Sequence, residues 1–226
     1  MKNFLYIFLF VLSACGTNNK QDKKTTTELP AFWNDIQDFK KQDSVSFPPK
    51  NAILFIGSSS FTMWKGVQDS FPDFTIINRG FGGSTLLDQL RYDNDIIFPY
   101  EPKQIVIYCG ENDLASSDTV TAVMVFERFK ELFQKIREKF PGIPVAYISM
   151  KPSPSRRHLF SNMREGNQLI KDFLASQKNG VFIDIHQPML NEKGEPIPEI
   201  YLDDSLHMNA KGYAIWKKEI EPYLIK

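Results

Sequence analysis

Residues 54–64 read LFIGSSSFTMW, an apolar run that ends in one glycine and is followed by three serines. A short, continuous apolar run of this kind is typical of a strand buried on both faces of a sheet. Serine is favoured at helix starts, where free backbone N–H groups can stabilise a developing negative charge. The stretch therefore predicts a strand, a turn and a helix, and it raises the question of whether one of the three hydroxyls is a nucleophile.

The rest of the chain repeats this alternation of strand and helix. Five apolar runs of strand length, rich in Ile, Val or Phe, occupy residues 52–56, 74–78, 104–109, 145–149 and 181–184. Stretches with helical spacing occupy residues 30–41, 119–140, 165–177 and 211–223. This alternation predicts one three-layer α/β/α domain with a five-stranded parallel sheet. Ligands of such sheets bind at the carboxyl ends of the strands, so motifs that follow strands are the candidates for function.

The composition narrows the class of protein. The 226 residues include 27 Lys and Arg and 27 Asp and Glu, so the formal net charge is zero. A nucleic-acid binder needs a basic face, and this balance argues against one. Of the two cysteines, Cys109 closes an apolar run and is expected to be a small buried residue, and the spacing to Cys15 suggests no disulfide.

The N-terminus has the pattern of an export signal rather than of a folded element. Lys2 precedes an apolar run over residues 4–12, which is far shorter than the roughly 20 residues that span a bilayer. The sequence Leu-Ser-Ala-Cys at 12–15 resembles the lipobox of bacterial lipoproteins, which implies cleavage before Cys15 and lipidation of that residue. A plain secretory signal is the alternative. We therefore expect a signal peptide at 1–14, a lipidated, flexible tether at 15–29 and the folded domain at 30–226.

Three polar motifs come at the ends of the first three strands. They are Gly57-Ser58-Ser59-Ser60, the glycine-rich stretch 78–85 and Gly110-Glu111-Asn112-Asp113. Each has an ordinary structural explanation, as a cap or a tight turn. Each can also serve a site, because a serine can be a nucleophile, glycines allow close backbone approach and the Asn112 side chain can donate an N–H.

A fourth motif, residues 203–209, supplies a carboxylate and an imidazole. Asp204 and His207 are three residues apart, so one turn brings them together. A carboxylate can hold a histidine in the tautomer that a general base requires. The other histidines are weaker candidates, since His158 lies in a basic loop and His186 has only Asp184 nearby as a possible second metal ligand.

Together these residues resemble the SGNH hydrolases, also called the GDSL esterase family, over nearly all of residues 52–216. The signature serine, glycine, asparagine and histidine fall on Ser59, Gly83, Asn112 and His207, and Asp204 completes the family's D-x-x-H arrangement. Ser58 stands where the family usually has Asp. Trp64 and the Gly-Gly turn look like the branch of platelet-activating-factor acetylhydrolase-like proteins, and the family implies a flavodoxin-like sheet.

The resemblance implies a mechanism and identifies the nucleophile as Ser59. His207 is then the general base, oriented by Asp204. The oxyanion hole consists of the backbone N–H groups of Ser59 and Gly83 and the side-chain amide of Asn112. No metal and no organic cofactor is needed. Arg156 and Arg157, in the loop after the fourth strand, are candidates for binding an anionic group or sugar hydroxyls, or else belong to a solvated basic loop.

The sequence thus predicts a serine esterase of the bacterial cell envelope, lipid-anchored through Cys15, that removes small acyl groups, most plausibly acetyl, from carbohydrate. A lipase or lysophospholipase is the alternative within enzymes. A glycan-binding lipoprotein on an inactive hydrolase scaffold is the alternative outside them. The oligomeric state is not predicted.

Overall fold

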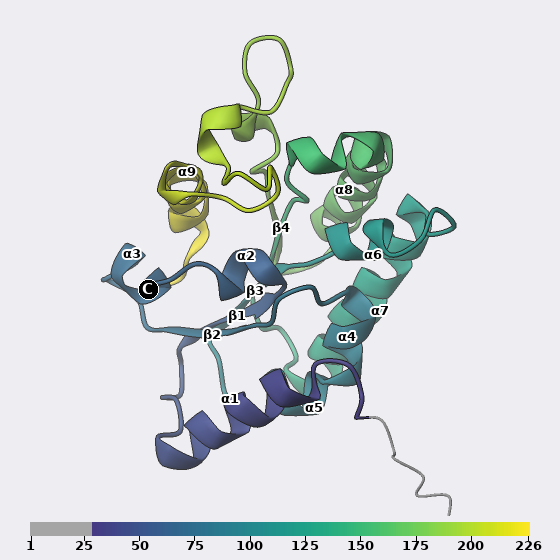
Figure 1. Ribbon diagram of the computed structural model, residues 1–226. Coiled ribbons are helices and arrows are strands. Elements are labelled where there is room, and N and C mark those ends of the chain that lie inside the picture. The colour runs from purple at the N-terminus through teal and green to yellow at the C-terminus, as the bar shows by residue number, and fades with distance from the viewer. Residues whose placement is uncertain (1–28) are drawn as a thin grey trace, which may run out of the picture. The chain divides into compact units, whose positions relative to one another are not determined.

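Five parallel strands form the sheet at the centre of the fold, in the order β2-β1-β3-β4-β5 (Figure 1). The strands are β1 (Ile53–Gly57), β2 (Ile76–Gly80), β3 (Gln104–Tyr108), β4 (Val145–Ile148) and β5 (Gly180–Ile183). The predicted five-stranded parallel α/β fold is therefore confirmed. In this order β1 lies between β2 and β3, so the chain reverses its direction of winding beside β1 and opens a crevice at its carboxyl end.

The second strand begins later than predicted. The apolar run at 74–78 suggested a strand from residue 74, but the N–H of Phe74 donates to the carbonyl of Phe71 and closes a turn, so the strand begins at Ile76. It then continues through Gly80, paired with β1. Residues 78–80 therefore belong to the strand, although the glycine-rich motif was expected to follow it.

Helices cover both faces of the sheet (Figure 1). One face packs against α1 (Trp33–Val45), α4 (Leu86–Arg91), α5 (Asp93–Ile96), α7 (Ala122–Lys139) and α8 (Phe160–Ala175). The other face packs against α2 (Ser59–Thr62), α3 (Val67–Ser70) and α9 (Ala210–Ile220). One α-helix remains, α6 (Glu111–Ala115), which follows β3. The 3₁₀ turns are η1 (Pro154–Leu159), η2 (Gln187–Met189), η3 (Pro198–Ile200) and η4 (Glu221–Tyr223).

The apolar runs form strands because both of their faces are buried. Along β1, Leu54 and Ile56 join one core while Ile53 and Phe55 join the other, as the two-residue period of a strand requires. Burial of both faces explains why the run has no alternating polar residues.

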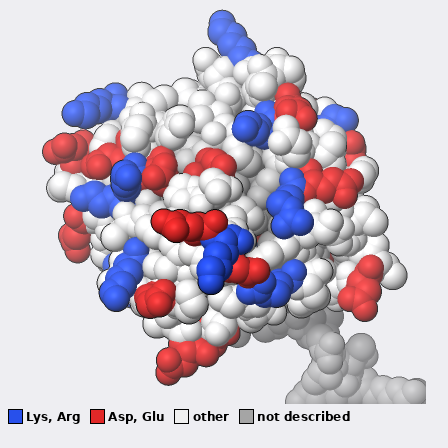
Figure 2. Space-filling model, turned by 90° about the horizontal axis from the view of Figure 1, so that it is seen from above, with Lys and Arg blue, Asp and Glu red and all other residues white. Residues whose placement is uncertain are grey.

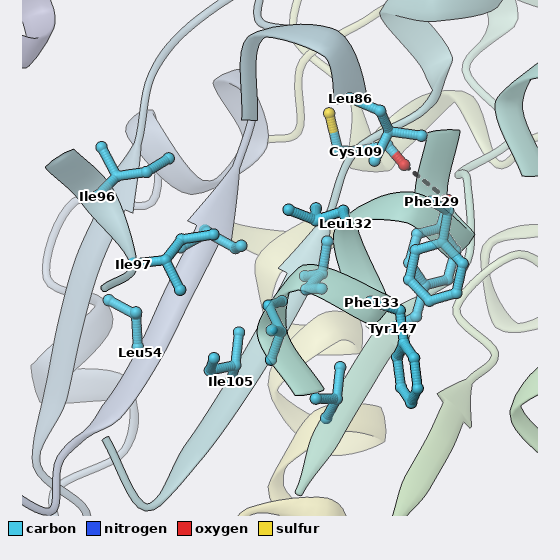
Figure 3. Packing of buried hydrophobic residues seen from close by; sticks show 14 of the residues in the cluster. Leu54, Leu86, Ile96, Ile97, Ile105, Cys109, Phe129, Leu132, Phe133 and Tyr147 are labelled. Atoms are coloured by element: carbon cyan, nitrogen blue, oxygen red, sulfur yellow. Dashed lines mark hydrogen bonds between the residues drawn. The ribbon is translucent and has the colours of Figure 1, made fainter. Parts of the chain in front are cut away.

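The longest helix, α7, shows the complementary helical pattern. Phe129, Leu132 and Phe133 lie on its buried face and pack over the sheet (Figure 3). In the same core the Tyr147 hydroxyl donates to the carbonyl of Cys109 at 2.6 Å. Cys109 is buried, as its place at the end of an apolar run predicted.

The structure describes residues 29–226, of which residues 31–226 form one compact unit. The predicted signal peptide, Cys15 and all but the end of the tether lie outside the described residues. Within the described residues, no helix has both the length and the apolar character needed to cross a membrane. On the face drawn in Figure 2, basic and acidic side chains are interspersed, in line with the zero net charge.

Candidate active site

Ser59 is the first residue of α2, directly beyond the carboxyl end of β1. The turn before it requires a glycine at position 57, where φ is +144° and a Cβ would lie 1.9 Å from the carbonyl oxygen of Tyr108. No other residue fits so close to the neighbouring strand. Gly57 thus allows the chain to leave the sheet sharply, and the short helix that follows presents Ser59 at its N-terminus.

His207 and Asp204 lie on the loop between η3 and α9. Asp204 Oδ1 accepts hydrogen bonds from the backbone N–H groups of Leu206 and His207, both at 2.9 Å. The N–H of Leu202 donates to the carbonyl of His207 at 2.7 Å and closes the loop. The carbonyl of Ser205 accepts from the N–H of Ser155 at 3.0 Å, which holds this loop against the loop that follows β4.

The three side chains form a continuous hydrogen-bonded chain. His207 Nδ1 lies 2.6 Å from Asp204 Oδ2, and His207 Nε2 lies 3.0 Å from Ser59 Oγ. A carboxylate only accepts, so Nδ1 carries the proton and Nε2 accepts from the serine hydroxyl. This is the tautomer that a general base acting on Ser59 requires.

Asp204 stays ionised over the range in which this chain would work. Its partial desolvation acts to raise the pKa, but the hydrogen bonds from the His207 ring and from the two backbone N–H groups outweigh it and lower the pKa to about 2. The carboxylate is therefore available to stabilise an imidazolium when His207 takes a proton.

Gly83 lies in the turn between β2 and α4 and lines the same cavity as Ser59. Its φ of +85° lies in the left-handed region, which a glycine occupies without strain. Within residues 29–226 its N–H has no hydrogen-bond acceptor, and the N–H of Ser59 lies at a helix start, where no intrahelical acceptor exists. A Cβ at position 83 would lie 3.8 Å from the ring of Phe32, and that ring packs edge-on against Phe81 at 5.3 Å between centroids.

Asn112 lies in the first turn of α6, beyond the carboxyl end of β3. Its Nδ2 donates to the carbonyl of Ser84 at 2.9 Å, so the amide is tied to the turn that carries Gly83. The helix itself is fixed by buried Asp113, which accepts from the N–H of Leu86 at 2.9 Å and from Arg128 at 2.8 Å. Ser59, Gly83 and Asn112, which carry the three predicted N–H donors, line one cavity together with His207.

A buried ionic cluster lies behind Asn112. Glu111 accepts from Lys151 Nζ at 2.9 Å and from Arg156 Nη1 at 3.3 Å, and the Tyr108 hydroxyl donates to its other oxygen. Arg156 Nη2 in turn donates to Asn112 Oδ1 at 2.6 Å. Burial acts to raise the pKa of Glu111, but the charges of Lys151 and Arg156 outweigh it and hold that pKa below its usual value. We name Glu111, Lys151 and Arg156 the ion cluster.

The two arginines of the loop after β4 differ. Arg156 lines the same cavity as Ser59, Gly83, Asn112 and His207, which measures about 360 Å³. Arg157 is not among the residues that line that cavity; its side chain is more than half exposed and pairs with Glu195. The structure therefore brings together every predicted site residue of the folded domain except Arg157, with Asp204 directly behind His207.

The site includes charged residues to which the sequence assigned no role. Glu111 and Lys151 are the clearest, because each comes three residues after the end of a strand and the two are buried against each other. A charged residue placed at the end of an apolar run was the available signal, but 40 residues separate the partners and spacing alone does not pair them. His186, weighed with Asp184 as a metal pair, instead directs Nδ1 at the carbonyl of Met150, 3.0 Å away. The described residues contain no group of three or more His, Cys, Asp or Glu arranged for a metal.

Comparison with protein families identifies the chain. The model of the GDSL-like lipase/acylhydrolase family matches residues 43–215, which include Ser59, Gly83, Asn112, Asp204 and His207. This chain belongs to that family. As a GDSL-like acylhydrolase it is a hydrolase that acts on esters. Comparison with the curated proteins finds no match.

Solved structures share the fold of this GDSL-like acylhydrolase at low sequence identity. A chain from Streptococcus pneumonia described as a platelet activating factor is 20% identical, with a TM-score of 0.74 over 85% of this chain and 92% of that one. A GDSL-like lipase from Bacteroides thetaiotaomicron is 21% identical, with a TM-score of 0.69 over 83% and 96%. An acetylxylan esterase from Geobacillus stearothermophilus is 14% identical, with a TM-score of 0.61 over 76% and 93%. The predicted SGNH hydrolase fold is thereby confirmed.

Proposed function

We propose that this chain is a serine esterase that cleaves esters through an acyl-enzyme on Ser59. The observation that carries the proposal is the hydrogen-bonded chain from Ser59 Oγ through His207 to Asp204, with distances of 3.0 and 2.6 Å. Nucleophile and base lie within hydrogen-bond reach, and a third group orients the base.

The proposed reaction has two halves. His207 Nε2 takes the proton of Ser59 as Oγ attacks the ester carbonyl, and Asp204 stabilises the imidazolium. The N–H groups of Ser59, Gly83 and Asn112 bind the oxyanion of the tetrahedral intermediate. His207 then gives its proton to the leaving alcohol, which leaves the acyl group on Ser59. In the second half His207 removes a proton from water, the resulting hydroxide attacks the acyl carbon, and the acid departs as Ser59 recovers its proton.

We propose esters of small acyl groups, in particular acetyl groups on a carbohydrate, as the substrate. Thr62, Met63 and Leu206 line the site cavity together with the catalytic groups, and its volume of about 360 Å³ has room for a short acyl group beside Ser59. The similar fold of an acetylxylan esterase is compatible with this choice. Membership of the platelet-activating-factor acetylhydrolase-like branch remains a proposal that rests on Trp64 and the Gly82-Gly83 turn.

One observation favours a lipid ester as the second candidate. Met63, part of the wall of the site cavity, also borders a neighbouring cavity of about 590 Å³ lined in part by Leu202, Met208 and Tyr213. A long acyl chain that passes Met63 would reach this apolar surface. A lipase or lysophospholipase would then prefer chains of eight or more carbons over acetate.

A chain-length series tests both candidates. Soluble protein beginning near Gly16, wild type and Ser59→Ala, is assayed on p-nitrophenyl esters from acetate to palmitate and on acetylated oligosaccharides. A kcat/KM that is highest for acetate and absent in Ser59→Ala supports the small-acyl esterase. A preference for long chains supports the lipase. If the wild type hydrolyses no ester and is not labelled by a fluorophosphonate, the proposed reaction is overturned, and the non-catalytic glycan-binding protein is the remaining candidate.

For location, we propose that Cys15 is lipidated and anchors the chain to a membrane of the bacterial cell envelope. The support is the Leu-Ser-Ala-Cys sequence at 12–15 and the polar stretch that follows. Metabolic labelling with an alkyne fatty acid should mark the wild type and not Cys15→Ala, and only the wild type should sediment with membranes. Equal sedimentation of an unlabelled wild type would contradict the anchor.

A further inference from the structure

Arg156 contacts the oxyanion-hole amide from the side opposite to Ser84. Its Nη2 donates to Asn112 Oδ1 at 2.6 Å, while Asn112 Nδ2 donates to the Ser84 carbonyl at 2.9 Å. A guanidinium only donates and a carbonyl only accepts, so the two contacts together determine which end of the amide is oxygen and which is nitrogen. Both contacts also fix the plane of the amide. Nδ2 carries a second N–H besides the one bound to Ser84, and Asn112 lines the same cavity as Ser59.

The guanidinium is itself held in place. Its Nη1 donates to Glu111 Oε2 at 3.3 Å, and its side chain is largely buried. Glu111 is in turn fixed by Lys151, whose backbone N–H donates to Oε1 at 3.0 Å and whose Nζ donates to Oε2 at 2.9 Å. Buried charges that are held by several hydrogen bonds have little freedom to turn. The guanidinium that contacts Asn112 is therefore held in a fixed position by Glu111 and Lys151.

We propose that Arg156 is a positioning residue for ester hydrolysis, which holds the Asn112 amide so that its free N–H points at the oxyanion. The proposal rests on the proposed function, since it concerns the same site. Its chemistry is that of preorganisation: a donor that is already aligned need not reorient as negative charge develops on the substrate. Without Arg156 the amide can rotate or turn over, and its carbonyl oxygen would then face the oxyanion.

Arg157 provides a matched control in the same loop. It carries the same charge one residue away, but it pairs with Glu195 at the surface and does not line the site cavity. A general effect of positive charge, or of the loop's stability, would appear in both arginines. An effect transmitted through Asn112 would appear only in Arg156.

The test is a double-mutant cycle of Arg156→Met and Asn112→Ala on the soluble chain, with p-nitrophenyl acetate as the probe. Loss of one oxyanion donor typically costs about 10²–10³ in kcat, which sets the ceiling for a residue that acts through that donor. We expect Arg156→Met to lower kcat about 10- to 100-fold with KM changed less than about threefold. In the Asn112→Ala background the same substitution should change kcat by less than about threefold. Arg157→Met should leave kcat and KM unchanged.

Chemical rescue separates positioning from folding. Guanidinium at millimolar concentration should restore part of the kcat of Arg156→Ala and nothing in Asn112→Ala, while ammonium should restore neither. Arg156→Lys should recover less than guanidinium does, since one ammonium cannot reproduce the planar fork that contacts Glu111 and Asn112 together.

Three results would overturn the proposal. If Arg156→Met lowers kcat equally in both backgrounds, Arg156 does not act through Asn112. If it raises KM only for esters of acidic sugars, Arg156 binds the substrate's anionic group. If guanidinium fails and the melting temperature falls in proportion to kcat, its role is structural. The wild type tests the proposed function separately. If the wild type neither hydrolyses an ester nor reacts with a fluorophosphonate, the proposed esterase activity is wrong, whatever the Arg156 variants do.

Discussion

Two charged networks meet at the active site, and they differ in burial. In the first, Asp204 and His207 lie on a loop, and the Asp204 side chain is 47% exposed. In the second, the side chains of Glu111 and Lys151 are 5% and 2% exposed beneath the same cavity. In the proposed reaction His207 moves protons and Asp204 orients it, and both lie at the rim, while Glu111 and Lys151 lie in the interior. We therefore expect substitutions at the rim to act mainly on the reaction and substitutions of the two buried residues to act mainly on stability.

The largest effect is expected at the rim. Asp204→Asn should lower kcat roughly 10⁴-fold, the loss known when a triad aspartate becomes asparagine and the histidine takes the wrong tautomer. Stability should change little, since the side chain is half exposed and its loop keeps its backbone hydrogen bonds. Esterase kinetics together with urea unfolding check both halves. A folded Asp204→Asn variant that keeps a tenth of the wild-type kcat would contradict a catalytic role for the exposed Asp204–His207 pair.

In the interior, Lys151→Met should act first on stability. Lys151→Met takes away the nearer cationic partner of buried Glu111, at 2.9 Å, and leaves only Arg156 at 3.3 Å to balance the carboxylate. Breaking a buried ion pair typically costs about 3–5 kcal/mol in the free energy of unfolding, and Arg156 should keep the cost near the lower end of that range. The double variant Glu111→Gln with Lys151→Met should recover part of that loss, because the buried side chain at position 111 no longer carries a charge and Arg156, its remaining neighbour, is partly exposed. Urea unfolding of the three proteins measures it. Equal stability of Lys151→Met and the wild type would show that the ion cluster is dispensable.

Asn112→Ala tests the point at which the two networks meet. We expect kcat to fall about 10²–10³-fold, because one oxyanion donor is lost, while far-UV circular dichroism stays native. An unchanged kcat in a folded variant would remove Asn112 from the oxyanion hole. A large loss of stability would instead place Asn112 with the interior group.

Asp43→Ala tests whether burial by itself connects a charge to activity. Asp43 pairs with Arg79 and accepts from the Tyr100 hydroxyl at 2.5 Å, which ties α1 to β2 away from the site cavity. Leaving Arg79 unpaired should cost about 1–3 kcal/mol of stability. The kcat should match the wild type. A fall in kcat with intact KM would mean that buried charges far from the cavity also tune the site.

The smallest effect concerns pH. The pKa of Asp204 is lowered to about 2 in the fold, below its ordinary value, so its contribution to stability is present above that ordinary value and is lost as the pH falls toward 2. Asp204→Asn should therefore flatten the acid side of the stability profile slightly between pH 4 and pH 2. Thermal unfolding of both proteins across that range measures the difference. An identical slope would show that the carboxylate is not stabilised in the fold.

The strands and the five site residues could be predicted from sequence patterns. Strands buried on both faces have uninterrupted apolar sequences, so four of the five strands begin and end within one residue of the predicted positions. The exception is β2, which begins at Ile76 and not at Phe74 because Phe74 closes a turn with Phe71. The helix at 165–177 in fact begins at Phe160, because η1 leads directly into it. Ser59, Gly83, Asn112, Asp204 and His207 were named through the family pattern, and the structure brings them together.

The ion cluster was beyond sequence reasoning for a physical reason. Glu111, Lys151 and Arg156 come from α6 and from the loop after β4, and only the parallel order of β3 beside β4 brings those segments together. An isolated charged residue in a loop predicts a solvated side chain. Arg157 follows that expectation, and Arg156 does not.

The packing of Phe32 against the Gly83 turn limits where the chain can be shortened. The family match begins at residue 43, yet the Phe32 ring lies beside Gly83, and the carbonyl of Ala31 accepts a hydrogen bond from the Tyr92 hydroxyl at 2.6 Å. Trimming a recombinant protein to the family boundary would remove most of α1 and the Phe32 ring that packs beside the Gly83 turn. The smallest unit worth expressing therefore begins before Ala31, a dozen residues upstream of the family boundary.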